Sequence, residues 1–224
     1  MSFGDKKLSE IAVSVPGSTS LLREYDLDFC CGGSDTLANA AAEKGLNLAE
    51  IETRLTELQN SKAENPEEYW VGANYGEVID HILVRYHQRH REQLQELIVL
   101  ADRVESVHGD RDDCPIGVAA ELRNVYDDLS NHMMKEELVL FPMIKAGNYM
   151  MAQMPIRMME MEHAEHGEHL DVLKSLTNNM TPPADACNTW RALYSGIQEF
   201  ADDLIMHIHR ENNVLFPSVI AENH

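Results

Sequence analysis

Two histidine–glutamate pairs with identical spacing occur in this chain. His132 is followed four residues later by Glu136 and then by a Leu-Phe-Pro sequence, and the same arrangement returns 75 residues later at His207 and Glu211. Residues four apart lie on one face of an α-helix, so each pair can direct an imidazole nitrogen and a carboxylate oxygen toward the same point. Two such pairs packed together would form a pocket able to bind two metal ions.

A second repeat lies upstream of each pair. The segment His87-x-x-His90-x-Glu-x-Leu returns 76 residues later as His163-x-x-His166-x-Glu-x-Leu. The chain therefore contains two copies of a helix pair, each with one helix that carries two histidines and one that carries a histidine and a glutamate. The spacing does not distinguish His87 from His90, or His163 from His166, as the ligand.

The candidate ligands continue apolar stripes along their helices. Ile197, Phe200 and Leu204 precede His207 and Glu211 at helical spacing, and the first pair lies on a stripe of the same kind. A single pair of this kind is more often a hydrogen-bonded pair on a surface. A carboxylate left alone on a buried face costs several kcal/mol or takes up a proton, so the recurrence of both glutamates indicates a cation. Imidazoles and carboxylates without a thiolate favour iron or manganese over a structural zinc site.

Four long helices must position these residues, and turn-rich segments separate them. We expect the helices at about residues 76–106, 117–146, 155–178 and 185–221. A small helical domain, residues 1–65, precedes this bundle domain of residues 76–222, and the polar segment SKAENP at 61–66 reads as the linker. No segment has the pattern of a β-strand, so the fold class is all-α.

The amino-acid composition limits the functions that a protein with this metal pocket can have. The 224 residues include 18 Lys and Arg against 38 Asp and Glu, a net charge of −20, which disfavours binding to nucleic acid or to an anionic membrane surface. No apolar run approaches the roughly 20 residues of a membrane span, and no secretory leader is evident. We expect a cytoplasmic protein, and four cysteines without a disulfide pattern agree with a reducing compartment.

Two adjacent cysteines form a separate candidate site. Cys30 and Cys31 precede two glycines, and a disulfide between sequence neighbours is strained. These features favour a redox, thiol-transfer or intermolecular role. The alternative is that both thiols pack a tight turn of the small N-terminal domain.

These motifs together resemble those of a known family. The duplicated helix pairs are similar to the hemerythrin-like fold, and their combination with the segment Tyr-Asp-Leu-Asp-Phe-Cys-Cys-Gly-Gly at 25–33 closely resembles the family of proteins for the repair of iron centres. The resemblance covers essentially the whole chain. It includes Arg-Tyr-His at 85–87, His-Met-Met-Lys-Glu-Glu at 132–137, Glu-His at 162–163 and Glu-Asn-Asn-Val-Leu-Phe-Pro at 211–217.

The resemblance implies a μ-oxo-bridged di-iron centre. Both glutamates would bridge the two iron ions, and the six implied ligands are His87, His132, Glu136, His163, His207 and Glu211. Four histidines instead of the five of true hemerythrins imply a more open pair of irons, which makes reversible O2 carriage less suitable. Glu162 and Asp128, near the site in sequence, are candidates for a polar route for iron or protons, with ordinary solvated acids as the alternative.

The function implied by the resemblance is repair of iron–sulfur clusters damaged by nitrosative or oxidative stress, through donation of iron or processing of NO. The expected partners are damaged iron–sulfur proteins and the small ligands NO or O2, and a homodimer fits this class. The alternative is a hemerythrin-like store or sensor for O2, NO or iron. Whether the chain acts as an enzyme, by NO reduction or nitrosyl transfer, stays open. His209, which lies outside the repeated motif, is expected on the surface.

Overall fold

The computed structural model describes residues 2–61 and 70–222, so most of the expected linker lies outside the described residues. The chain divides into two compact units. One comprises residues 1–78 together with 208–224, and the other residues 79–207. Within the described ranges every regular element is a helix, and the sole β-type pairing is the isolated bridge between Lys7 and Thr36. The all-α class predicted from the sequence is confirmed.

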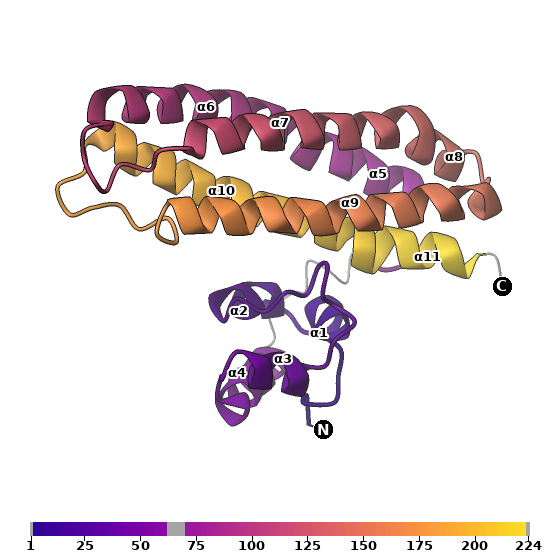
Figure 1. Ribbon diagram of the computed structural model, residues 1–224. Coiled ribbons are helices and arrows are strands. Elements are labelled where there is room, and N and C mark those ends of the chain that lie inside the picture. Colours follow the sequence, from indigo (N-terminus) through magenta and orange to yellow (C-terminus); the bar gives the residue numbers. More distant parts are fainter. Residues whose placement is uncertain (1, 62–69, 223–224) are drawn as a thin grey trace. The chain divides into compact units, whose positions relative to one another are not determined.

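Short helices build the N-terminal part of the first unit (Figure 1). They are α1 (Leu8–Ser14), α2 (Ser18–Glu24), α3 (Leu37–Glu43) and α4 (Leu48–Asn60). Thr36 is the N-cap of α3, since its side chain accepts a hydrogen bond from the backbone N–H of Asn39 at 3.3 Å. The core residues of this part are Leu8, Ile11, Leu22, Leu37, Ile51 and Leu55.

The long helices of the bundle run alongside one another (Figure 1). Their segments are α5 (Tyr75–Ile82), η2 (Leu83–His87), α6 (Gln88–His108), α7 (Val118–Lys135), η3 (Glu136–Leu140), α8 (Phe141–Lys145), α9 (Tyr149–Leu176), α10 (Asn188–Arg210), η4 (Glu211–Leu215) and α11 (Phe216–Ala221). The apolar stripe predicted on the last helix is buried, since Ile197, Phe200 and Leu204 are at most 1% exposed. Burial of these residues directs the side chains that continue the stripe inward.

The third long helix differs from its predicted extent. It was expected to begin at residue 155, but α9 begins at Tyr149, and Pro155 lies inside it. Proline lacks an N–H and normally ends a helix. Here the carbonyl that loses its partner is that of Met151, whose side chain lies on the solvent side of α9, so water can replace the missing bond.

Each of three long helices contains one π-helical turn. In η2, η3 and η4 the backbone N–H of the next residue bonds to the carbonyl five positions back, from Gln88 to Leu83, from Phe141 to Glu136 and from Phe216 to Glu211. Single π-turns inside α-helices occur frequently at functional sites. All three turns contain a candidate ligand: His87, Glu136 or Glu211.

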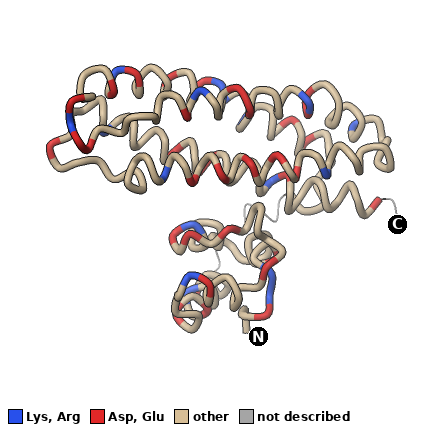
Figure 2. Tube along the Cα trace, in the orientation of Figure 1, with Lys and Arg blue, Asp and Glu red and all other residues tan. Residues whose placement is uncertain are grey.

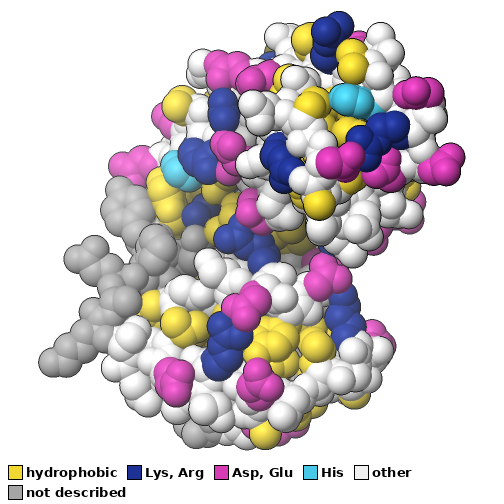
Figure 3. Space-filling view, turned by 90° about the vertical axis from the view of Figure 1, so that its left-hand side faces the viewer, with side chains coloured by type: hydrophobic (Ala, Val, Ile, Leu, Met, Phe, Trp, Pro, Cys, Tyr) yellow, Lys and Arg dark blue, Asp and Glu magenta, His cyan; other side chains and the backbone are white. Residues whose placement is uncertain are grey.

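Charged side chains are distributed along the surface of both units. Acidic residues recur along the bundle helices (Figure 2), and on the face drawn in Figure 3 basic side chains lie among acidic ones instead of forming a field of one sign. Among the described residues, no helix is long and apolar enough to span a membrane.

Candidate metal centre

Six buried side chains converge on two adjoining positions in the bundle. One group of four contains His87 and His207, and the other contains His132 and His163. Glu136 and Glu211 belong to both groups, and within each group one ligand atom per residue lies within 4.8 Å of the others. All six side chains are at most 1% exposed. The structure thus brings together the six residues that the family resemblance implies as ligands.

The imidazole nitrogens of each group face each other. The Nε2 atoms of His87 and His207 are 3.2 Å apart, and those of His132 and His163 are also 3.2 Å apart. Glu136 Oε2 lies between the two groups, 3.3 Å from His87 Nε2 and 3.4 Å from His132 Nε2. Glu211 follows His207 by one turn on an unbroken helix.

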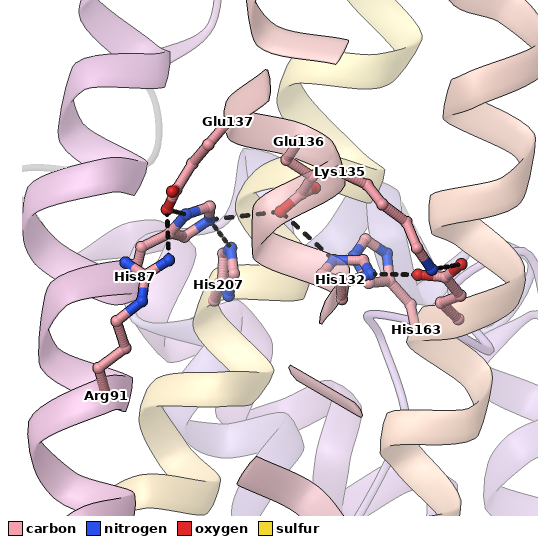
Figure 4. A network of polar contacts seen from close by, with 9 residues as sticks. His87, Arg91, His132, Lys135, Glu136, Glu137, His163 and His207 are labelled. Carbon is pink, nitrogen blue, oxygen red and sulfur yellow. Dashed lines mark hydrogen bonds and ion pairs between the residues drawn. The ribbon is translucent and has the colours of Figure 1, made fainter. Parts of the chain in front are cut away.

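Two further carboxylates orient ligand histidines from outside the cluster (Figure 4). His132 Nδ1 lies 3.0 Å from Glu162 Oε2, and Lys135 Nζ donates to the other oxygen of Glu162 at 2.6 Å. The hydrogen bond to His132 outweighs the effect of burial and, together with Lys135, lowers the pKa of Glu162 to about 2. An ionised carboxylate only accepts hydrogen bonds, so Nδ1 of His132 carries a proton and donates it to Glu162, while Nε2 faces the cluster.

The same arrangement holds His87. Its Nδ1 atom lies 2.8 Å from Glu137 Oε1, which also accepts from Arg91 Nη2 at 2.7 Å. The hydrogen bond to His87 outweighs burial and, together with Arg91, lowers the pKa of Glu137 to about 2. A carboxylate behind a ligand histidine fixes the tautomer and raises the basicity of the ligand nitrogen. Glu137 has no recognisable role in the sequence, because its partner comes from another helix and no local spacing reveals the contact.

The geometry suits first-row metal ions. With metal–ligand bonds of about 2.0–2.2 Å, neighbouring ligand atoms lie about 3 Å apart. The nitrogen–nitrogen and nitrogen–oxygen separations of 3.2–3.4 Å around His87, His132 and Glu136 are close to this requirement. Two imidazole nitrogens and two shared carboxylates per position suit a pair of cations bridged by the glutamates.

The second histidine of each upstream pair lies beside the cluster. His90 and His166 are buried, and their rings contact those of His207 and His132 at centroid distances of 5.3 and 4.9 Å. Neither belongs to the two ligand groups formed by the described residues. Burial, reinforced by the neighbouring histidines, lowers the pKa of His166 to about 2, and burial likewise lowers the pKa of His90. Both rings are therefore neutral at physiological pH.

The two acids proposed for a polar route occupy different environments. Glu162 contacts the candidate ligand His132 and is 14% exposed, so it links the cluster to the surface. Asp128 is 59% exposed and lies 3.1 Å from His169 Nε2, whose Nδ1 atom is 2.6 Å from Glu121. The structure does not bring Asp128 into contact with the six cluster residues.

Cys30 and Cys31 lie in a loop of the other compact unit. Neither cysteine forms a disulfide, and the two Sγ atoms are 3.8 Å apart. Asp28 Oδ1 accepts from the backbone N–H groups of both cysteines, at 3.0 and 2.9 Å, and lies 3.3 Å from Cys30 Sγ. The contact with Cys31, burial and the charge of Asp28 together raise the pKa of the Cys30 thiol. The three side chains lie close enough to hold a soft metal ion, whereas at neutral pH the Cys30 thiol stays protonated.

His209 is buried, and the expectation that it lies on the surface is wrong. Its ring packs edge-on against Phe29 at a centroid distance of 5.3 Å, and its Nδ1 atom accepts a hydrogen bond from Asn213 Nδ2 at 2.8 Å. Asn213 also donates to the Phe29 carbonyl, and Asn212 donates to the Cys30 carbonyl at 3.0 Å. These long-range contacts cover a helix face that the sequence pattern leaves polar.

Comparison with known proteins identifies both parts of the chain. Residues 78–219 match the hemerythrin HHE cation-binding domain, and residues 4–59 match ScdA_N, described as a domain of unknown function (DUF542). A Haemophilus influenzae protein named "Probable iron-sulfur cluster repair protein" is 67% identical over 99% of this chain and its own full length. Proteins named "Iron-sulfur cluster repair protein YtfE" are 54% identical in Musicola paradisiaca, over 98% of each chain, and 54% identical in Citrobacter koseri, over 99% of each chain.

The structure agrees with these matches along the chain. The bundle that contains the six-residue His/Glu cluster is all-helical and matches the cation-binding domain, and the N-terminal helices match the second domain. The chain therefore belongs to the repair-of-iron-centres family, with a hemerythrin-type cation-binding domain.

Proposed function

We propose that the bundle holds two iron ions and that Glu136 and Glu211 bridge them. The observation that carries this proposal is the sharing of two buried glutamates by two His/His groups. A buried carboxylate needs a compensating cation. One ion held by His87 and His207 and a second held by His132 and His163 would supply that compensation, and a μ-oxo-bridged di-iron centre would fit this set of ligands.

Iron suits this donor set. Imidazole and carboxylate ligands without thiolate favour iron or manganese, and each position receives two nitrogens and two carboxylate oxygens from the chain. Such a set leaves a coordination position open for a small ligand such as NO. When bound, the iron pair supplies redox chemistry. Glu137 and Glu162 hold His87 and His132 in the tautomer in which Nε2 is available to the metal.

The chain, on this proposal, repairs iron–sulfur clusters damaged by nitrosative or oxidative stress. The relatives of matching length are named for iron–sulfur cluster repair, which supports this proposal. Iron released from the bundle is then cargo for a damaged iron–sulfur protein of the cytoplasm. Loss of one ion is compatible with the fold, because each His/His group stands on its own pair of helices.

We assign the iron chemistry to the bundle domain, residues 76–222, and a part in delivery to the small domain, residues 1–65. Cys30 and Cys31, held by Asp28, are the groups there that can accept a soft metal ion or exchange thiols. The Cys30→Ser/Cys31→Ser variant should keep the iron of the bundle and repair clusters more slowly.

The decisive experiment adds iron-loaded protein to a purified iron–sulfur enzyme inactivated with NO, and measures recovered activity. The iron-loaded chain should restore activity, whereas the iron-free chain and the Glu136→Leu variant should not. Reversible O2 binding by a protein that leaves the damaged enzyme inactive would instead support a store or sensor. Stoichiometric zinc without iron in the purified protein would contradict the metal assignment.

A further inference from the structure

Exposed apolar side chains gather on one part of the bundle. The described residues include fourteen large hydrophobic side chains that are exposed, and eight of them lie between residues 134 and 161. Five are methionines of α9. We call this set the methionine surface: Met134, Leu138, Val139, Met150, Met151, Met154, Met158 and Met161. Single exposed apolar residues need no explanation, but a cluster of this size marks an interaction site.

The methionine surface is continuous across two adjacent helices. Lys135 of α7 bonds to Glu162 of α9, and farther along the same helices Asp128 bonds to His169, so α7 and α9 run antiparallel side by side. Leu138, one turn beyond Lys135, therefore lies opposite Met158, one turn before Glu162.

The α9 methionines repeat at helical spacing. Met151, Met154, Met158 and Met161 step by three or four residues, so they form one stripe. The stripe runs along α9 beside the exposed residues of α7 and η3. Together these side chains cover the outer side of the segment that carries Glu136 inward.

The side-chain path from the six-residue His/Glu cluster to the surface, through Glu162, ends beside this stripe. Glu162 is the group that touches the candidate ligand His132 on one side and is partly exposed on the other. It directly follows Met161 in the chain and lies one turn beyond Met158. Figure 4 shows the Glu136 segment running between His87 and His132, with Lys135 on the His132 side. A protein bound to the methionine surface would cover this side-chain path, and the second path, from His87 to Glu137, reaches the surface at the residue that directly precedes Leu138.

We propose that the methionine surface is the docking site for the iron–sulfur protein under repair, an inference that rests on the proposed function. Methionine is unbranched and flexible, and surfaces rich in it adapt to partners of different shape. A repair protein must bind iron–sulfur proteins that share a damaged cluster but not a surface.

The test compares two triple variants. Leu138→Gln/Met154→Gln/Met158→Gln makes the methionine surface polar, while Val99→Gln/Val107→Gln/Val172→Gln changes three exposed apolar residues elsewhere on the bundle. For the methionine-surface variant, the concentration of NO-inactivated iron–sulfur enzyme that gives half-maximal repair should rise about tenfold or more, since a few side chains near the centre of an interface contribute most of its binding free energy. The valine variant should repair like the parent. Iron content, and iron release to a small chelator, should be the same in all three proteins.

A second measurement does not depend on the triple variant keeping its iron. A photo-activated cross-linking residue at Leu138 should capture the purified target, and the same residue at Val99 should not. Unchanged repair kinetics in the methionine-surface variant would overturn the docking proposal while leaving the repair function intact. Loss of self-association without a change in repair would assign the surface to a second copy of this chain. Failure of the iron-loaded parent to repair the target would overturn the repair function itself.

Discussion

His132 Nδ1 lies 3.0 Å from Oε2 of Glu162, on the side of the ring opposite the six-residue His/Glu cluster. The contact fixes the tautomer of His132 and connects a fully buried ligand candidate to a partly exposed carboxylate. Glu137 has the same relation to His87. The cluster is therefore supported on two sides by acids that do not themselves belong to it.

Replacement of Glu162 by glutamine should weaken iron binding without unfolding the bundle. The amide can still meet His132, but it lacks the charge that favours the proton on Nδ1, and loss of such a partner typically costs about 10–100-fold in metal affinity. Competition with a chelator measures the change. Glu165→Gln, an exposed change one turn farther along α9, serves as the control. Equal affinity in the two variants would show that the contact with His132 does not tune the site.

Replacement of Glu136 by leucine should remove both irons and keep the helices. Glu136 Oε2 lies 3.3 Å from His87 Nε2 and 3.4 Å from His132 Nε2, so its loss affects both positions. Leucine continues the apolar stripe, and the iron-free variant should be at least as stable as the iron-free parent because one of the two buried carboxylates is removed. Metal analysis and circular dichroism measure the two effects. A Glu136→Leu protein that retains both irons would rule out the bridging assignment.

Periodicity in the sequence is sufficient to predict the buried stripes. Ile197, Phe200 and Leu204 recur at helical spacing and are buried, since an amphipathic helix can bury only the face that its apolar residues define. The spacing of His132 and Glu136 likewise predicts that both point inward. These relations lie within one helix, where geometry is nearly fixed by the chain.

Relations between helices are not predictable in this way. Glu137 meets His87 and His209 meets Phe29 across long sequence separations, and no local pattern encodes either contact. The π-turns are also missed, since their apolar spacing differs little from that of an α-helix. The start of α9 at Tyr149 instead of about residue 155 is also not predicted. Proline normally ends a helix, whereas Pro155 lies inside α9, and Met151, whose carbonyl loses its partner, is an exposed residue.

Replacement of His87 or His90 by alanine should show which of the two histidines is the metal ligand. His87 Nε2 lies 3.2 Å from His207 Nε2, whereas His90 approaches Gln93 Oε1 at 3.4 Å and lies outside the ligand groups. His87→Ala should lower iron occupancy sharply, and His90→Ala by no more than the about 10–100-fold in affinity typical of an outer partner. The same order should hold for His163→Ala and His166→Ala. The reverse order in either pair would transfer the ligand role to the second histidine.

Stability should depend on pH through His169, which lies between Glu121 and Asp128 at 2.6 and 3.1 Å. Burial of the ring works to lower the pKa of His169, but the hydrogen bonds to both carboxylates outweigh it and raise that pKa above its usual value. A histidine whose pKa is higher in the folded than in the unfolded chain stabilises the fold fully below the unfolded value, near 6.5, and this contribution disappears as the pH rises through the folded value.

The His169→Gln variant keeps hydrogen-bond donors for the two acids but cannot gain a charge. Its thermal midpoint should therefore fall below that of the parent at about pH 6, and the difference should shrink as the pH rises through the raised pKa of His169, where the parent ring loses its charge. Glu121→Gln should lower the pKa of His169 and move the loss of stability to lower pH. The His169–Glu121 pair is partly exposed to solvent, so added salt should reduce the difference in thermal midpoint between the parent and the variant. A difference between parent and His169→Gln that is constant over this range would show that His169 stabilises the bundle by packing and not by its charge.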